Sequence, residues 1–149
     1  MNKYYFFGAL SIFFLCNAFV SKAQLPLSWE QLRDVKYTKK YVPAEDMDAF
    51  YPTFGAKVNV FQGKEVYITG YIVPVDVFAG IYVLSKYPFA ACFFCGGAGP
   101  ETVVALKFKK EKQKFKTDQW LCVKGKLQLN ATDVYDMMYI IQNAEVYAP

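Results

Sequence analysis

The stretch from Gln62 to Pro74 reads Gln-Gly-Lys-Glu-Val-Tyr-Ile-Thr-Gly-Tyr-Ile-Val-Pro. The apolar side chains of Val66, Ile68 and Ile72 alternate with the more polar ones of Tyr67, Thr69 and Tyr71. This alternation is the period-two pattern of a half-buried strand. Gly70 interrupts this pattern, and a glycine inside a strand indicates a sharp bend or bulge. Such a bend lets one strand run across two parts of a closed barrel. The stretch therefore predicts the long first strand of a small β-barrel, ended by Pro74.

A second stretch, from Trp120 to Leu129, repeats this pattern with Gly125 in the place of Gly70. We expect the two glycines to mark bends at matching heights of one barrel. Three further strands are predicted by apolar runs bounded by turn residues, at 81–85, 102–108 and 138–147. Five strands with an insertion between the third and fourth, and no long helix, fit a mainly β, five-stranded OB-like barrel. A small sandwich is the alternative.

The segment before the barrel predicts little regular structure. Ser28 followed by Gln31 matches a capping box, so a short N-terminal helix should begin there. Polarity rises from Lys36 onward, and residues 44–50 are compatible with one more helical turn, ended before Pro52.

The first 23 residues have the form of a secretory signal peptide. A basic start precedes an apolar run from Tyr4 to Val20, and Ser21-Lys22-Ala23 supplies the small residues of a cleavage site. An uncleaved anchor is the alternative. Cleavage leaves residues 24–149 as one domain, periplasmic or secreted, with membrane contact only through the signal peptide. Because Lys3 and Lys22 are lost, the net charge falls from +4 to +2, which is too small to indicate nucleic acid.

The chemically distinctive segment runs from Ala91 to Glu101 and reads Ala-Cys-Phe-Phe-Cys-Gly-Gly-Ala-Gly-Pro-Glu. The mature chain keeps three cysteines, and an odd number in an exported protein indicates a free thiol, an interchain bond or a metal site. The sequence has no histidine. That absence excludes histidine-dependent nucleophilic catalysis and histidine-ligated zinc.

The cysteines support a metal hypothesis and a disulfide hypothesis. Cys92 and Cys95 have the C-x-x-C spacing that chelates one ion, and Cys122 is the expected third donor because it shares a polar strand face with lysines. Glu101, water or a second chain would complete the site, for zinc or copper(I). A disulfide is the alternative, since export favours oxidation. Thioredoxin-type redox chemistry is disfavoured because the following glycines and Pro100 prevent the helix that activates such a thiol.

A lysine-rich run from Lys107 to Lys116 includes Phe108 and Phe115. Basic grooves with aromatic side chains bind single-stranded nucleic acid in some OB barrels. We interpret this run instead as the tip of a hairpin, kept soluble by lysines that also discourage pairing between strand edges. We therefore expect no nucleic-acid binding.

The segment from Gly63 to Pro74, together with Ala91-Cys92 and Pro100, resembles a family of small exported bacterial proteins of unknown function with an OB-like barrel. Many relatives carry an Ile-His pair and several prolines after the matching Ala-Cys, whereas this chain has Phe93, Phe94 and Cys95 there. The resemblance implies export and a fold, and it implies no activity.

These features together predict an exported, non-enzymatic OB-like module. It is expected to bind a soft metal ion, zinc or copper, or a protein partner, through the Cys92/Cys95 loop with Cys122. A homodimer is a further possible partnership. The alternative is a thiol-disulfide protein, or a binding domain that carries a purely structural disulfide.

Overall fold

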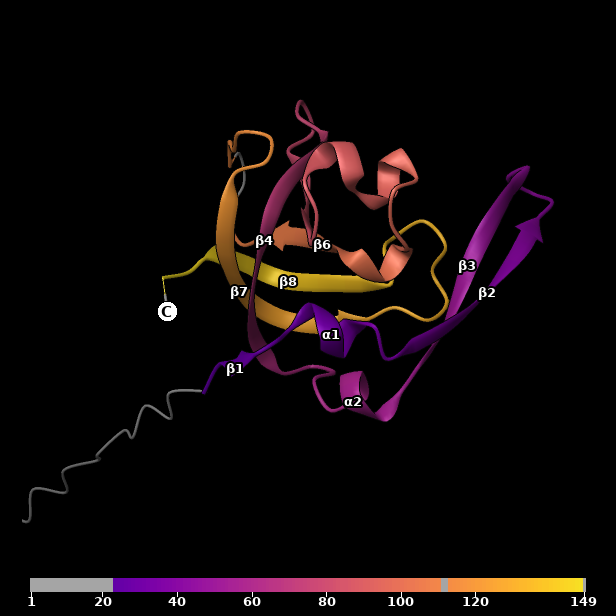
Figure 1. Cartoon of the computed structure of the whole chain (residues 1–149), viewed down its shortest axis with the longest axis horizontal. Coiled ribbons are helices and arrows are strands. Elements are labelled where there is room, and N and C mark those ends of the chain that lie inside the picture. Colours follow the sequence, from indigo (N-terminus) through magenta and orange to yellow (C-terminus); the bar gives the residue numbers. More distant parts are fainter. Residues whose placement is uncertain (1–22, 111–112, 149) are drawn as a thin grey trace, which may run out of the picture.

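The computed structural model describes residues 23–110 and 113–148, so most of the predicted signal peptide lies outside the described residues. Five strands form the body of the molecule (Figure 1): β4 (Glu65–Asp76), β5 (Ile81–Ser85), β6 (Val103–Phe108), β7 (Trp120–Leu129) and β8 (Tyr139–Val146). All five were predicted from the sequence, although β4 does not end at Pro74 as expected but stays paired with β5 as far as Asp76.

The five strands close into a barrel. Their order is β4-β5-β6-β8-β7, and β7 pairs back onto β4 to complete the circle. Every pairing is antiparallel except that of β6 with β8. This order, with a single parallel pair between the third and fifth strands, confirms the predicted mainly β, OB-like barrel. A short strand β1 (Leu25–Pro26) adds in parallel to β4.

The helix α1 (Trp29–Leu32) is attached to the barrel by two side-chain hydrogen bonds. The predicted capping box is present, since Ser28 accepts from the backbone of Gln31 and the Gln31 side chain bonds back to the cap. Trp29 Nε1 donates to the carbonyl of Thr69 at 2.8 Å, and Tyr139 Oη donates to the carbonyl of Leu32 at 2.6 Å. Leu32 is fully buried, so the helix covers part of the barrel core. A further short helix, α2 (Ala56–Asn59), lies close to α1.

Gly70 and Gly125 both face the crowded interior, but they do not lie at matching heights. The strands β4 and β7 are antiparallel, so Gly70 pairs with Leu121 and Gly125 pairs with Val66. A Cβ atom on Gly70 would lie 2.6 Å from the Ser85 carbonyl oxygen, and one on Gly125 would lie 2.6 Å from that of Gln142. Glycine is therefore required at both positions because another strand's backbone approaches closely there, and not because the two strands bend at the same height of the barrel.

The expected second helical turn at residues 44–50 is wrong. Instead, β2 (Val35–Val42) and β3 (Met47–Phe54) form an antiparallel hairpin that extends away from the barrel (Figure 1). Its turn contains Pro43, and Asp46 adopts a positive φ of 48°. Val, Tyr and Thr make up five of the eight residues of β2, and β-branched and aromatic side chains pair well across strands.

Three one-turn 3₁₀ helices, at Phe89–Ala91, Phe93–Cys95 and Pro100–Thr102, carry the cysteine loop between β5 and β6. Within residues 23–110 and 113–148, no helix has the length and hydrophobicity required to cross a membrane.

Candidate functional site

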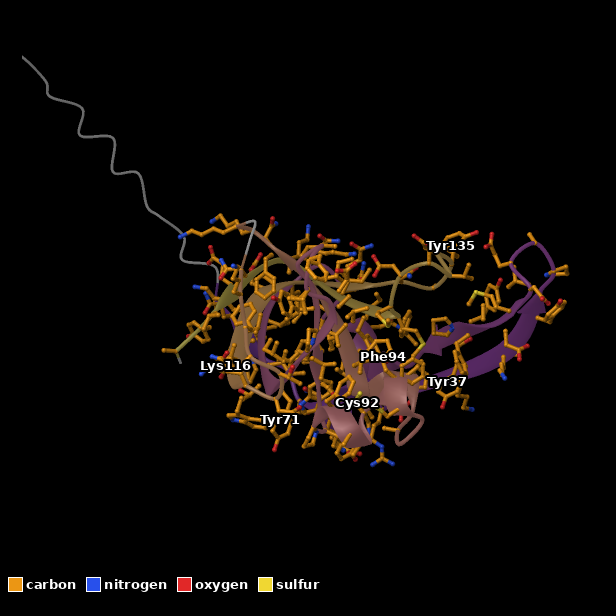
Figure 2. The ribbon with its side chains drawn as sticks, turned by 90° about the horizontal axis from the view of Figure 1, so that it is seen from above. Tyr37, Tyr71, Cys92, Phe94, Lys116 and Tyr135 are labelled. Atoms are coloured by element: carbon orange, nitrogen blue, oxygen red, sulfur yellow. The ribbon has the colours of Figure 1, made fainter. Side chains whose placement is uncertain are left out.

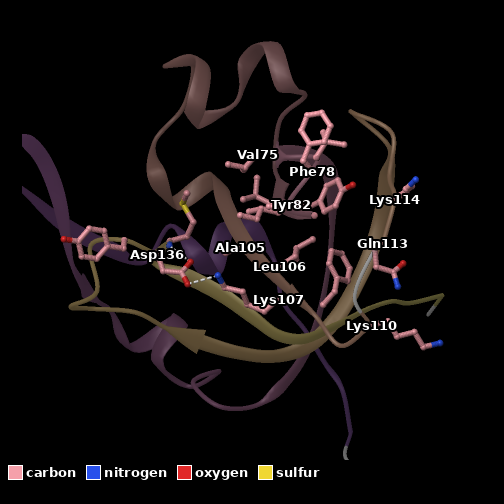
Figure 3. A pocket seen from close by; sticks show the side chains of 18 residues that line it. Val75, Phe78, Tyr82, Ala105, Leu106, Lys107, Lys110, Gln113, Lys114 and Asp136 are labelled. Carbon is pink, nitrogen blue, oxygen red and sulfur yellow. Dashed lines mark hydrogen bonds and ion pairs between the residues drawn. The ribbon is translucent and has the colours of Figure 1, made fainter. Parts of the chain in front are cut away.

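A groove of about 970 Å³ lies beside the β4–β5 turn and the loop between β7 and β8 (Figure 3). Its floor is apolar and comes from β5 and β6, including Val83, Ala105 and Leu106. In OB barrels this same combination, the second and third barrel strands with the first and fourth connecting loops, forms the binding face. The groove therefore occupies the position at which this fold binds ligands.

The β4–β5 turn exposes an apolar ridge at the side of the groove. Its side chains are about half exposed or more, and Phe78 is completely exposed; the ridge consists of Val75, Val77, Phe78 and Ile81. Asp76 Oδ1 fixes the turn by accepting hydrogen bonds from the backbone N–H groups of Phe78 and Ala79 at 2.8 and 2.9 Å. Gly80 has a φ of +69°, which favours glycine. The local sequence thus holds apolar side chains in solvent, where turns usually carry polar ones.

Charged side chains border the groove on the β6 side. Lys107 Nζ lies 3.0 Å from Asp136 Oδ2, and this ion pair connects β6 to the β7–β8 loop (Figure 3). Lys110 and Lys114 extend the border, and among the described residues its four charged side chains sum to +2. Tyr135 lies in the same loop and donates a hydrogen bond to Glu45, in the turn of the β2–β3 hairpin. The groove therefore combines an apolar surface with a basic rim.

The cysteine loop packs on another part of the outer barrel surface. Cys92 is fully buried against Val73, Val83 and Val103, so its sulfur fills a small apolar cluster. Cys95 is exposed, and its Sγ donates to the carbonyl of Phe89 at 3.1 Å. Partial desolvation and then the neighbouring Cys92 raise the pKa of the Cys95 thiol above its ordinary value. A raised pKa disfavours the thiolate that nucleophilic redox chemistry requires.

Cys122 does not lie with the other two cysteines. It occupies the polar outer face of β7, as predicted, and is paired with Thr69 of β4. Cys92 packs instead on Val73 of β4. Val73 is four residues beyond Thr69 on that strand, and four residues of a strand span roughly 13 Å. The β5 and β6 strands beneath the loop also lie on the opposite side of β4 from β7.

Glu101 is likewise placed apart from the thiols. Its carboxylate packs directly on Gly99, in a shallow pocket that Arg33 and Lys86 also line. Among the described residues, no three Cys, His, Asp or Glu side chains gather as they would around a metal ion. Of the four expected metal donors, the structure therefore brings together only Cys92 and Cys95.

Aromatic side chains connect the cysteine loop to the β2–β3 hairpin. Phe93 lies edge-to-face with Phe50 at 6.2 Å, and Phe50 in turn contacts Tyr37 at 5.3 Å between ring centroids. Figure 2 shows Cys92, Phe94 and Tyr37 near this junction, with Tyr135 at the upper edge of the molecule in this view. All three described cysteines are free thiols.

Sequence reasoning singled out the lysine-rich run from Lys107 to Lys116, which borders the groove, but missed the apolar ridge of the β4–β5 turn. The available signal was the apolar turn Val77-Phe78-Ala79-Gly80, because a fully exposed phenylalanine in a short turn has no obvious role in the core.

The fold defines a small OB-like barrel with a groove over its second and third strands. It is similar to a solved structure described as a DUF3299 family protein from Pseudomonas aeruginosa PAO1, with a TM-score of 0.52 and 20% identity. The similarity covers 85% of this chain and 98% of the other, and it establishes the shared fold. No family model matches the sequence, and no curated protein matches it.

Proposed function

We propose that this chain is an exported, non-enzymatic module that binds a protein partner in the groove over β5 and β6. The observation that carries the proposal is the apolar ridge around Phe78, held in solvent beside a lysine rim at the face where OB barrels bind ligands. The proposal keeps the protein partner expected from the sequence and moves its binding surface from the cysteine loop to this groove.

The chemistry of the groove favours a polypeptide segment with apolar and acidic side chains. Val75, Phe78 and Ile81 offer apolar contact area, while Lys110 and Lys114 offer positive charge for carboxylates. The groove is concave between the turn and the β7–β8 loop, which suits a chain segment better than a flat membrane surface. Aromatic rings also line the groove, at Phe78, Tyr82, Phe108 and Tyr135, so nucleic acid is the competing ligand class that the experiment must test.

The proposal is testable with a displayed library of random twelve-residue peptides. Peptides should be selected on the wild-type protein and then measured against Phe78→Ser and Phe94→Ser. Phe94 is a matched control, because it is an exposed phenylalanine of the cysteine loop, 42% accessible. We expect selected peptides to combine apolar and acidic residues, and to lose about tenfold or more in affinity with Phe78→Ser only. Their affinity should also fall as salt is increased.

Three results would overturn this proposal. The first is equal binding to wild type and Phe78→Ser, and the second is loss of binding with Phe94→Ser, which would return the site to the cysteine loop. The third is displacement of the peptides by an oligothymidylate or by phosphatidylglycerol vesicles at lower concentrations than the peptides themselves.

A second candidate function rests on the proximity of the Cys92 and Cys95 thiols. Two thiolates are too few for a closed four-coordinate zinc site, whereas soft thiolate donors select copper(I). Oxidation of the same pair would give the alternative structural disulfide. Metal content and thiol count on one anaerobically purified sample separate these states. Bound copper with no detectable free thiol at Cys95 supports the metal, and two thiols lost without metal support the disulfide.

A further inference from the structure

The outer edge of β2 is an interaction surface separate from the groove, and we propose that it accepts an extended acidic segment of another protein as a third strand. The β2–β3 sheet contains only these two strands in the described part of the chain. Each strand is eight residues long, and Ala49 is the one buried residue of the sixteen. A two-stranded ribbon with so little burial is marginally stable alone, and a third strand would stabilise it.

The edge of β2 is better suited to strand addition than that of β3. An edge strand points the N–H and C=O groups of alternate residues outward, where another strand can pair with them. β2 contains no proline, so its full set of backbone donors is available, whereas β3 lacks one donor at Pro52. Residues 36–41 of β2 are all exposed, and the hairpin extends from the barrel (Figure 1).

The charges of β2 determine the kind of partner. The strand carries Lys36, Lys39 and Lys40 and no acidic residue. Lys39 is neutralised by Asp48 of β3 at 2.8 Å. Lys36 and Lys40 project from the opposite face, four residues apart, and Lys40 also lies over the Tyr51 ring. A partner strand with acidic residues four positions apart would place one carboxylate beside each of these lysines.

A second copy of this chain is a poor occupant of the same edge. Pairing β2 with another β2 would place six lysines on two strands about 4.8 Å apart, and like charges on adjacent strands are destabilising. Charge complementarity therefore favours a different, acidic protein.

The proposal is testable with a capped nine-residue peptide of threonine and valine that contains two glutamates four positions apart. Hydrogen exchange of the full mature protein should show new protection of about half of the β2 amides, those that point outward. A peptide of the same composition with its glutamates five positions apart places them on opposite faces, and should bind several-fold more weakly. Two further peptides, N-methylated at one or the other alternate set of residues, test backbone pairing directly. One should bind like the parent and the other about tenfold or more weakly.

Charge-reversal variants identify the surface. The double variant Lys36→Glu and Lys40→Glu should weaken the peptide about tenfold, while Lys114→Glu, on the groove rim, should leave affinity unchanged. Exchange rates of the barrel strands confirm that each variant is folded. Equal binding of both N-methylated peptides, protection confined to residues 81–110, or insensitivity to the double variant would each overturn strand addition. Strand addition by a different protein would also be overturned if, in the absence of peptide, the protection of β2 amides rose with protein concentration.

Discussion

At the scale of single residues, period-two alternation predicts the face of a side chain but not its neighbours. The pattern around Cys122 correctly placed it on the polar face of β7. Its distance from Cys92 depends instead on which strands the cysteine loop crosses, and that order is set by barrel closure. The three cysteines of the predicted mature chain therefore supported a metal site that the described structure does not bring together.

The thiols should differ in their reactivity toward a maleimide. In the reduced native protein, Cys95 and Cys122 should be labelled, whereas Cys92 should react only after unfolding, because it is fully buried. The raised pKa of Cys95 means that its labelling rate should keep increasing at pH values above 9.0, the ordinary thiol pKa. Mass spectrometry of the digested protein measures each site. Rapid native labelling of Cys92 would contradict the packing described for the cysteine loop.

Substitution of either inward-facing glycine should destabilise the barrel. A methyl group at Gly70 or Gly125 would lie 2.6 Å from a backbone carbonyl oxygen. Gly70→Ala and Gly125→Ala should each lower the free energy of unfolding by about 1–3 kcal/mol, the usual cost of overpacking. Urea denaturation measures this difference. The exposed Lys114→Ala serves as the control and should change stability by less than about 0.5 kcal/mol.

At the scale of elements, the β2–β3 hairpin is the part of the fold that the sequence analysis failed to predict. Its first strand is rich in lysine and the hairpin contains Pro43 and Pro52, so local polarity suggested irregular structure. The ribbon depends on contacts from distant parts of the chain, including Phe93 and Tyr135. Local patterns carry no information on such contacts, so the hairpin could not be predicted from its own residues.

Removal of the Phe93 ring should loosen the hairpin while leaving the barrel intact. Phe93 contacts Phe50, which joins β3 to the cysteine loop. In Phe93→Ala, the amides of β2 and β3 should exchange several-fold faster, because an aromatic pair contributes about 0.5–1.5 kcal/mol beyond its buried area. Hydrogen exchange followed by NMR measures each strand. Equal acceleration in β4 and β7 would show instead that the hairpin and the barrel unfold together.

At the scale of the whole molecule, the barrel was predictable because its strands repeat one physical rule. Apolar residues at every second position fill a common interior, and the glycines in β4 and β7 mark sites of close backbone approach. The apolar ridge of the groove and the hairpin followed no such rule, because most of their side chains are exposed and are not selected for packing in a core. The site was therefore less predictable than the fold.

The alkaline stability of the whole barrel should depend on Tyr139. This side chain is fully buried, and its hydroxyl donates to the Leu32 carbonyl. Burial, and then the nearby Glu101 and Asp34 carboxylates, raise the pKa of Tyr139 well above the ordinary tyrosine value of 10.0. Above pH 10 the unfolded chain loses this proton and the folded chain keeps it, so stability should fall as pH rises.

Comparison with Tyr139→Phe isolates this contribution. At pH 8 the variant should be less stable by about 1 kcal/mol, because the Leu32 carbonyl loses its donor. Above pH 10 the wild type should lose stability more steeply than the variant, so the two curves should converge and then cross. Tyr41 and Tyr135, whose pKa values are raised by hydrogen bonds to Asp46 and Glu45, are present in both proteins and cancel. Urea unfolding from pH 8 to about pH 11 measures both curves. Parallel curves over this range would show that Tyr139 ionises equally in the folded and unfolded chains, which is incompatible with a hydroxyl buried between the barrel and α1.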